Sequence, residues 1–160
     1  MNHMFFDLEG VLIDSWFNPE ILTDLKPIIG QMDCIDLFTF AIYNKEDMDL
    51  FNTSIKPKIE AFFGKKVNIV QSREELIPIL NKNGHEGRHI DNPELSDFYT
   101  KAEAFRAYIQ NQYNSGEFLL IDDQVPDSLL EIDGKDVLKI GTASITTIRD
   151  AIKRSQSNQN

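Results

Sequence analysis

The chain has only one cysteine, Cys34, and far fewer basic than acidic residues, and these shortages exclude several classes of protein. One thiol allows no intramolecular disulfide and no zinc site built from thiolates. The 16 Lys and Arg residues stand against 26 Asp and Glu residues, which gives a net charge of -10 at pH 7. No basic run is available to neutralise phosphates, so we expect no extended nucleic-acid groove and no binding to an anionic membrane.

Long apolar runs are also missing, since none approaches the roughly 20 residues that a membrane-spanning helix needs. The segment MNHMFFDLEG has an acid at Asp7 and lacks the cationic start and long apolar stretch of a secretion signal. A hydrophobic fraction of 41%, with 11 phenylalanines, is nevertheless too high for a disordered chain. We therefore expect a cytoplasmic protein with a single domain over residues 1–154 and a disordered polar tail, SQSNQN, over residues 155–160.

Short apolar runs alternate with longer segments of helical character, and this alternation predicts a doubly wound α/β fold with a mostly parallel five-stranded sheet. Each run is only a few residues long and almost wholly apolar, as expected for strands that are buried on both faces. The predicted strands are Met4–Phe6, Ile35–Ile42, Val67–Val70, Phe118–Ile121 and Val137–Ile140.

Helical spacing and capping residues define the segments between these strands. Asn18 is a plausible N-cap with Pro19 at the first helical position, and Pro57 is expected to break or kink the helix that contains it. Capping boxes begin at Ser72 and at Thr100. The predicted helices are Pro19–Ile29, Lys45–Phe63, Arg73–Asn81, Thr100–Tyr113, the short Ser128–Ile132 and Ile145–Arg154.

Acidic side chains follow two of the predicted strands. Asp7 and Glu9 come after the first strand, and Asp122 and Asp123 come after the fourth. Because open α/β sheets bind ligands beyond the carboxyl ends of their strands, we expect these acids to meet at one edge of the sheet. Neighbouring carboxylates repel one another unless a hard cation such as Mg2+ compensates them. With Lys101 available to neutralise a phosphate, the set predicts a phosphoryl-transfer site.

The motifs MFFDLEGVLID and FLLIDDQVPDS resemble the first and fourth motifs of the haloacid dehalogenase (HAD) superfamily. In the first motif an apolar strand is followed by Asp-x-Asp-Gly-Thr/Val-Leu. In the fourth, an apolar strand ends in an Asp pair with another acid some four residues on. The resemblance runs from Met4 to about Ile140, and Lys101 stands where the third motif has its lysine. It implies a HAD-like, Rossmann-like domain that is a Mg2+-dependent phosphatase.

The resemblance also implies a role for each matching residue. Asp7 would be the nucleophile that forms an aspartyl-phosphate, and Glu9 would be the general acid and base. Gly10 would let the loop and its backbone N–H groups approach the phosphate, which Tyr43 and Asn44 would contact from the second motif. Lys101 would hold Asp7 and the phosphoryl oxygens. The implied Mg2+ ligands are Asp7, the backbone carbonyl of Glu9, and Asp123 with Asp122 in support.

Two residues depart from the family pattern. Glu9 is one methylene longer than the usual Asp, although the family includes active members with Asp-x-Glu-Gly. Tyr43 stands where a Thr or Ser hydroxyl normally contacts the phosphate, and the nearby Thr39 is expected in the middle of a strand. These departures keep a catalytically silent HAD-fold binding protein as an alternative. A receiver domain of the response-regulator type ranks third, because its acid pair would follow the first strand rather than the fourth.

The spacing of the motifs leaves no room for a sizeable cap domain. About 20 residues separate Ile13 from Ile35, and a strand, helices and a loop account for the interval from Asn44 to Lys101. The resemblance therefore implies a capless member, which acts on macromolecular phosphates or uses an oligomer partner as its lid. We expect the substrate to be a phosphorylated small molecule or the terminal phosphate of a macromolecule. The aperiodic loop Lys82–Phe98 is the candidate for contacting it.

Overall fold

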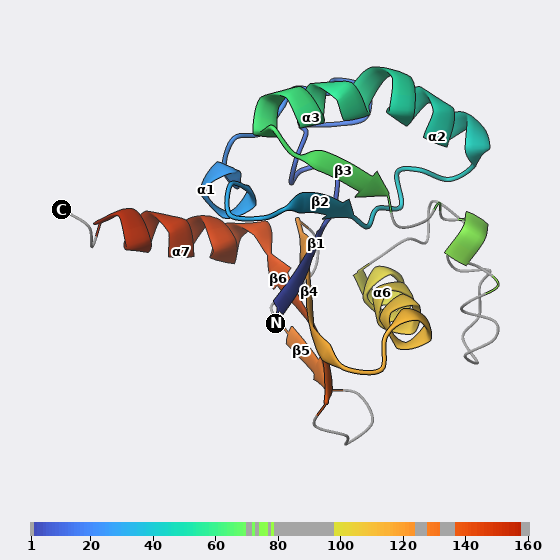
Figure 1. The fold of residues 1–160 in the computed structure, drawn as a ribbon, viewed down its shortest axis with the longest axis vertical. Coiled ribbons are helices and arrows are strands. Elements are labelled where there is room, and N and C mark those ends of the chain that lie inside the picture. Colours follow the sequence, from blue (N-terminus) through green and yellow to red (C-terminus); the bar gives the residue numbers. More distant parts are fainter. Residues whose placement is uncertain are drawn as a thin grey trace.

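The computed structural model describes residues 2–69, 72, 74–76, 78, 98–123, 128–131 and 137–157. Figure 1 shows the arrangement of its helices and strands. The strands are β1 (Asn2–Phe6), β2 (Cys34–Leu37), β3 (Lys66–Ile69), β4 (Gly116–Asp122), β5 (Ser128–Glu131) and β6 (Leu138–Ser144). The helices are α1 (Lys26–Ile29), α2 (Lys45–Leu50), α3 (Lys56–Phe63), α6 (Phe98–Gln112) and α7 (Ile145–Ser157), and the π-helical segment η1 (Phe51–Ile55) joins α2 to α3. None of the described helices combines the length and the apolar character that crossing a membrane would require.

A single twisted sheet forms the centre of the molecule, with its strands in the order β3-β2-β1-β4-β6-β5. The first five strands in this order are all parallel, and each contains part of a predicted strand, so the predicted Rossmann-like α/β arrangement is confirmed. The sixth strand, β5, pairs antiparallel to β6 and was not predicted. A helix over Ser128–Ile132 is therefore wrong. An isolated helical turn is unstable in water, whereas the same short segment gains cross-strand hydrogen bonds along the edge of β6.

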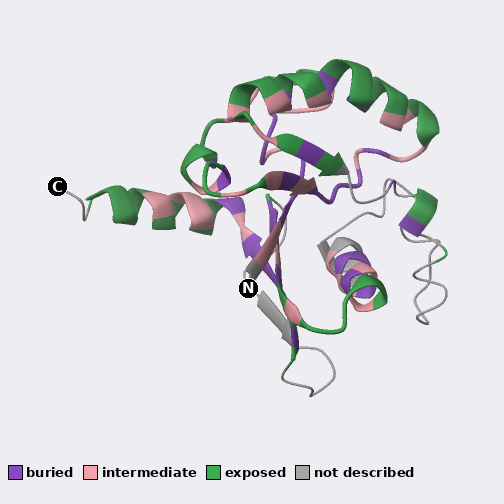
Figure 2. Cartoon of the chain, in the orientation of Figure 1, coloured by how far each residue is buried: buried purple, intermediate pink, exposed green. Residues whose placement is uncertain are grey.

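Helices cover both faces of the sheet, as a doubly wound fold requires (Figures 1 and 2). On one face, α6 buries Phe105 against Phe5 and Phe38, with ring centroids 5.3 and 5.2 Å apart in edge-to-face geometry. On the other face, a larger apolar cluster joins the sheet to α1, η1, α3 and the start of α7. The sheet is thus buried on both sides in its centre, which explains why its inner strands read as apolar runs.

Strand β2 is shorter than predicted. It ends at Leu37, and the Phe38 N–H still donates to Phe6 O at 2.9 Å before the chain leaves the sheet. The prediction that the strand continues to Ile42 is wrong, and so is the placement of Thr39 in mid-strand. Thr39 Oγ1 accepts a hydrogen bond from Ala41 N at 3.1 Å, and such a local bond from a hydroxyl competes with continued strand pairing.

The helix predicted over Pro19–Ile29 is mostly wrong, because only its last residues are helical, as α1. The preceding residues form a hairpin over residues 12–22, in which Leu22 N donates to Leu12 O at 2.9 Å. Pro27 lies in the first turn of α1, where its missing N–H costs nothing. A proline does lie in the first turn of this helix as predicted, but it is Pro27 and not Pro19.

The helix with an internal proline occurs as predicted. It runs through α2, η1 and α3, and the π-helical register lies directly before Pro57. Proline has no N–H to donate to the Thr53 carbonyl, so the regular ladder is interrupted there. The predicted capping box also forms: Ser72 N donates to Glu75 Oε1 and Glu75 N donates to Ser72 Oγ, both at 3.2 Å. Residues 74–76 behind it are helical.

The two later helices are confirmed with shifted ends. Helix α6 begins at Phe98, two residues before Thr100, so Thr100 lies inside the helix and is not its N-cap. Helix α7 continues to Ser157, three residues into the segment expected as a disordered tail. The continuation follows from the composition of this segment, since Ser and Gln can extend a helix that is already nucleated.

Candidate active site

The strand order reverses between β1 and β4, and a crevice is expected at the carboxyl ends of these two strands. From β1 the chain moves outward on one side to β2 and β3, and it then returns to place β4 on the other side of β1. Asp7 follows β1 directly, and its N–H donates to Ile121 O at 2.9 Å. Asp122 and Asp123 directly follow Ile121 at the end of the neighbouring strand β4. The strand order alone therefore brings the three acids to the same edge of the sheet.

The carboxylates of Asp7, Asp122 and Asp123 each offer an oxygen that lies within 4.8 Å of the other two. Asp7 is only 6% exposed and Asp122 only 1%, whereas Asp123 faces solvent. Two oxygens on opposite sides of a bound Mg2+ are separated by about 4.2 Å, so this spacing suits a small divalent cation. The donor set also suits it chemically, because Mg2+ prefers carboxylate oxygens and compensates the repulsion among them.

Gly10 is required by the way the loop after β1 passes over Asp123. Its φ of +76° is a conformation that favours glycine, and a Cβ at this position would lie 2.7 Å from Asp123 Cγ. Its N–H donates to Ile13 O at 2.8 Å inside the loop. Gly10 therefore contributes to the site because it has no side chain, which lets the loop lie against Asp123. Its N–H is used within the loop.

Glu9 lies in the same loop, but its carboxylate is turned toward the hairpin of residues 12–22. Its Oε2 accepts a hydrogen bond from Trp16 N at 2.8 Å in partly buried surroundings. This bond fixes the carboxylate and couples it to the position of the hairpin. The expected metal role of Glu9 concerns its backbone carbonyl and is independent of this contact.

Thr39 is a polar residue at the same edge of the sheet as the three acids, although the sequence predicted it in the middle of a strand. The register of β1 and β2 pairs Phe6 with Leu37, so Phe38 is level with Asp7 and Thr39 lies one residue beyond that level at the same edge of the sheet. It is 3% exposed, and its hydroxyl accepts from Ala41 N while keeping a proton to donate. In the segment IDLFTF, Thr39 is the first polar residue after the strand, which ends at Leu37.

Tyr43 and Asn44 form the turn that begins α2. Asn44 is the N-cap, and its side-chain oxygen accepts from Asp47 N at 3.0 Å. Tyr43 N donates to Asp47 Oδ2 at 3.0 Å, and Tyr43 O accepts from Glu74 N at the same distance. These bonds show a helix-capping role for the pair. A hollow of about 230 Å3 adjoins this turn and is lined by Asn44, Lys45, Met48, Ser72, Glu74 and Glu75.

Two predicted features fall outside the described residues in whole or in part. Lys101 is the fourth residue of α6, and the description covers its backbone but not its side chain. The loop Lys82–Phe98 is not described apart from Phe98, which begins α6.

Comparison with known proteins identifies no relative of this chain: no family model, no curated protein and no solved structure matches it. The chemistry of the site is consequently inferred from its own residues. The strongest feature is a group of three acids, two of them buried, at the point where the strand order reverses.

Proposed function

We propose that the protein is a Mg2+-dependent phosphohydrolase that cleaves a phosphate monoester through an aspartyl-phosphate on Asp7. The observation that carries this proposal is the meeting of Asp7, Asp122 and Asp123 at one sheet edge. Bringing three carboxylates together, two of them buried, destabilises a fold unless a positive charge compensates them. A bound Mg2+ would supply this positive charge, and it could hold a phosphate ester beside Asp7. The resemblance of the two motifs to the HAD superfamily favours the same chemistry.

The proposed reaction gives Asp7 and Glu9 the roles that the resemblance to the HAD superfamily implies. When bound by Asp7, Asp122 and Asp123, Mg2+ would neutralise their charge and polarise the phosphoryl oxygens. A carboxylate oxygen of Asp7 attacks phosphorus while the bond from phosphorus to the ester oxygen breaks. Glu9 supplies the proton that the leaving alcohol takes up.

The second half of the proposed reaction returns the enzyme to its starting state. Glu9, now ionised, removes a proton from a water molecule that attacks the phosphorus of the aspartyl-phosphate. The bond between Asp7 and phosphorus breaks, inorganic phosphate leaves, and the Asp7 carboxylate is restored. Because Trp16 N holds Glu9 Oε2, we assign both proton transfers to Oε1.

The proposed enzyme is a HAD-like domain without a sizeable cap, acting on a phosphorylated small molecule or on the terminal phosphate of a macromolecule. The net charge of -10 argues against a substrate that needs an extended basic groove. We also propose that Lys101 pairs with Asp7 and the phosphoryl oxygens, because it stands where the third motif of the HAD superfamily has its lysine.

The direct test is hydrolysis of p-nitrophenyl phosphate by the wild-type protein, together with its melting temperature, each with and without Mg2+. We expect Mg2+-dependent hydrolysis. We also expect Mg2+ at about 100 times its Kd to stabilise the fold by about 2.7 kcal/mol, which raises the melting temperature by several degrees. If Mg2+ changes neither quantity, the proposal is wrong and the catalytically silent binding protein takes its place.

We assign to Thr39 the phosphate contact that the sequence analysis gave to Tyr43. The Thr39→Val variant keeps a similar shape but removes the hydroxyl, and a hydrogen bond to a charged group contributes about 1.5–3 kcal/mol. We therefore expect kcat/KM to fall by about 10- to 100-fold in this variant. Thr39→Ser, which keeps the hydroxyl, should stay within a few-fold of wild type.

Tyr43→Phe is the matched control, because it removes the competing hydroxyl from the turn before α2. We expect its kcat/KM to stay close to that of the wild type. A larger loss in Tyr43→Phe than in Thr39→Val would return the phosphate contact to Tyr43. Melting temperatures of all three variants distinguish a lost contact from a damaged fold.

A further inference from the structure

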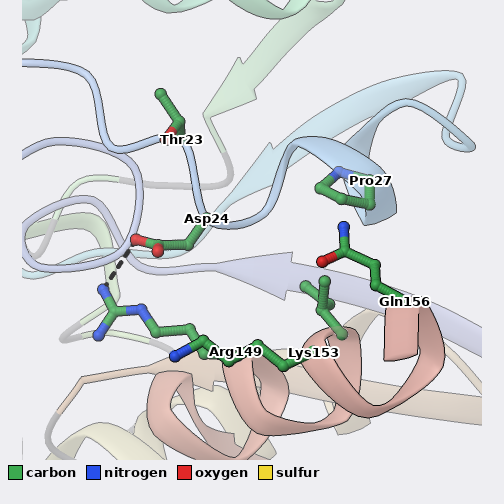
Figure 3. A pocket seen from close by; sticks show the side chains of 7 residues that line it. Thr23, Asp24, Pro27, Arg149, Lys153 and Gln156 are labelled. Atoms are coloured by element: carbon green, nitrogen blue, oxygen red, sulfur yellow. Dashed lines mark ion pairs between the residues drawn. The ribbon is translucent and has the colours of Figure 1, made fainter. Parts of the chain in front are cut away.

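A second hollow lies between α7 and the segment that leads into α1, apart from the three acids. Its volume is about 210 Å3, which is the space of about seven water molecules. Figure 3 shows the side chains around it. The lining residues are Thr23, Asp24, Pro27, Arg149, Ile152, Lys153 and Gln156. None of the acids at the carboxyl ends of β1 and β4 belongs to this set.

The charges around this hollow differ in sign from those of the whole chain. Arg149 and Lys153 stand one turn apart on α7 and extend in the same direction in Figure 3. Asp24 is the acid among the lining residues, and its Oδ2 pairs with Arg149 Nη2 at 3.1 Å. Two cations against one acid leave a local positive charge in a protein of net charge -10. Like charges four residues apart on a helix also repel each other, and a bound anion would relieve that repulsion.

Arg149 carries a hydrogen-bond donor that this ion pair does not use. Its Nε is buried and has no hydrogen-bond partner among the described residues. A buried donor without an acceptor is costly, so a shift of the guanidinium toward an anion in the hollow would give this donor an acceptor that it lacks in the described structure. A guanidinium can serve two acceptors at once because its N–H groups point in different directions in one plane.

We propose that the hollow between α1 and α7 binds a small phosphate-bearing anion. Arg149, the Lys153 ammonium and the Gln156 amide are three separate donor groups around one space. A phosphate has at least three oxygens in a tetrahedral arrangement to accept from them, whereas a carboxylate has two in one plane. Pro27 and Ile152 complete the lining with apolar surface, against which a small organic group on the phosphate can pack. This proposal does not depend on the phosphatase reaction.

The test is a titration of the wild-type protein with inorganic phosphate, followed by NMR at the Arg149 Nε–H signal and at the backbone amides of α7. Mg2+ is removed with EDTA so that the three acids do not contribute. Ionic strength is held constant with chloride, because exposed charges are screened by salt. We expect saturable shifts at Arg149 that acetate at the same concentration does not produce. The proposal is overturned if phosphate produces no saturable shift, or if acetate reproduces it.

Variants localise the binding. Lys153→Gln changes an exposed side chain and should weaken phosphate binding at least about tenfold without unfolding the protein. Arg149→Gln should weaken it as much or more, and its melting temperature reports the loss of the pair with Asp24. Lys58→Gln, on α3 and outside the hollow, is the matched control and should bind like wild type. Equal weakening in Lys58→Gln would mean unspecific attraction to surface charge and would refute the site.

A second arm separates a soluble ligand from a lipid headgroup with the same chemistry. The protein is mixed with vesicles that contain phosphatidic acid and is then sedimented. We expect no co-sedimentation, because the rest of the surface is acidic and would be repelled. Co-sedimentation that is lost in Lys153→Gln would replace the soluble ligand by a membrane phosphate and would overturn the proposal as stated.

Discussion

Replacing Asp7 with Asn is expected to reduce Mg2+-dependent hydrolysis of p-nitrophenyl phosphate by about 10^4-fold or more, because removing a catalytic nucleophile costs at least that much in kcat. An amide oxygen is a far weaker nucleophile than a carboxylate, so the aspartyl-phosphate would not form. The same change removes one of the three charges that would hold Mg2+. We therefore expect a smaller rise in melting temperature on adding Mg2+ as well.

The fold should survive this substitution. Asn has nearly the shape of Asp, and the bond from Asp7 N to Ile121 O involves only the backbone. Without Mg2+ the variant should melt at or above the wild-type temperature, because one charge is removed from a group of mutually repelling carboxylates. Asp49→Asn, at an exposed position of α2, is the matched control and should leave both activity and the Mg2+ response unchanged. If Asp7→Asn retains more than a tenth of the activity, another group is the nucleophile.

The parts of the fold that could be predicted are those that depend on short stretches of sequence. The apolar runs around Phe5, Leu37 and Leu120 are strands because residues of a parallel sheet are buried whichever face they occupy. Once the strands are parallel, their carboxyl ends share one edge. The meeting of Asp7 with Asp122 and Asp123 then follows from strand order alone, without any knowledge of side-chain positions.

The errors lie where pairing with a distant segment overrides local preference. Residues 128–131 become a strand because β6 offers an edge, and the residues before α1 become part of a hairpin because residues 12–14 lie beside them. The end of β2 was misplaced for a related reason. Phe40 and Ile42 are apolar and buried, but they pack in the chain that follows the strand rather than within it. This error hid Thr39 from the predicted site and made Tyr43 appear to be the only hydroxyl available.

The glycine of the first motif shows the same limit at the level of one residue. The sequence places Gly10 in the loop after the first strand, but it cannot reveal that a side chain at this position would meet Asp123, which follows another strand. That contact joins two segments more than a hundred positions apart in the chain. A glycine is therefore needed at this position for the packing of the loop against Asp123 as well as for the turn.

The contact predicts that Gly10→Ala damages the site more than it damages the fold. An alanine at a positive φ costs about 1–2 kcal/mol in backbone strain. Its Cβ would also lie 2.7 Å from Asp123 Cγ, so the Asp123 carboxylate must leave the position in which it meets Asp7 and Asp122. Asp123 is exposed and can move without disturbing the core. A displacement of about 1 Å at a catalytic group reduces turnover by about 100-fold, and we expect a loss of that order together with a weaker Mg2+ response.

Gly64→Ala is the matched control for this prediction. Gly64 has a similar φ of +66°, and a Cβ there would meet nothing within 4 Å. Both variants should therefore lose a similar few degrees of melting temperature in the absence of Mg2+, since both carry the same kind of backbone strain. Only Gly10→Ala should lose hydrolysis and the stabilisation by Mg2+. If Gly10→Ala responds to Mg2+ as Gly64→Ala does, Asp123 is not a ligand, and the metal would have to be held by Asp7 and Asp122 alone.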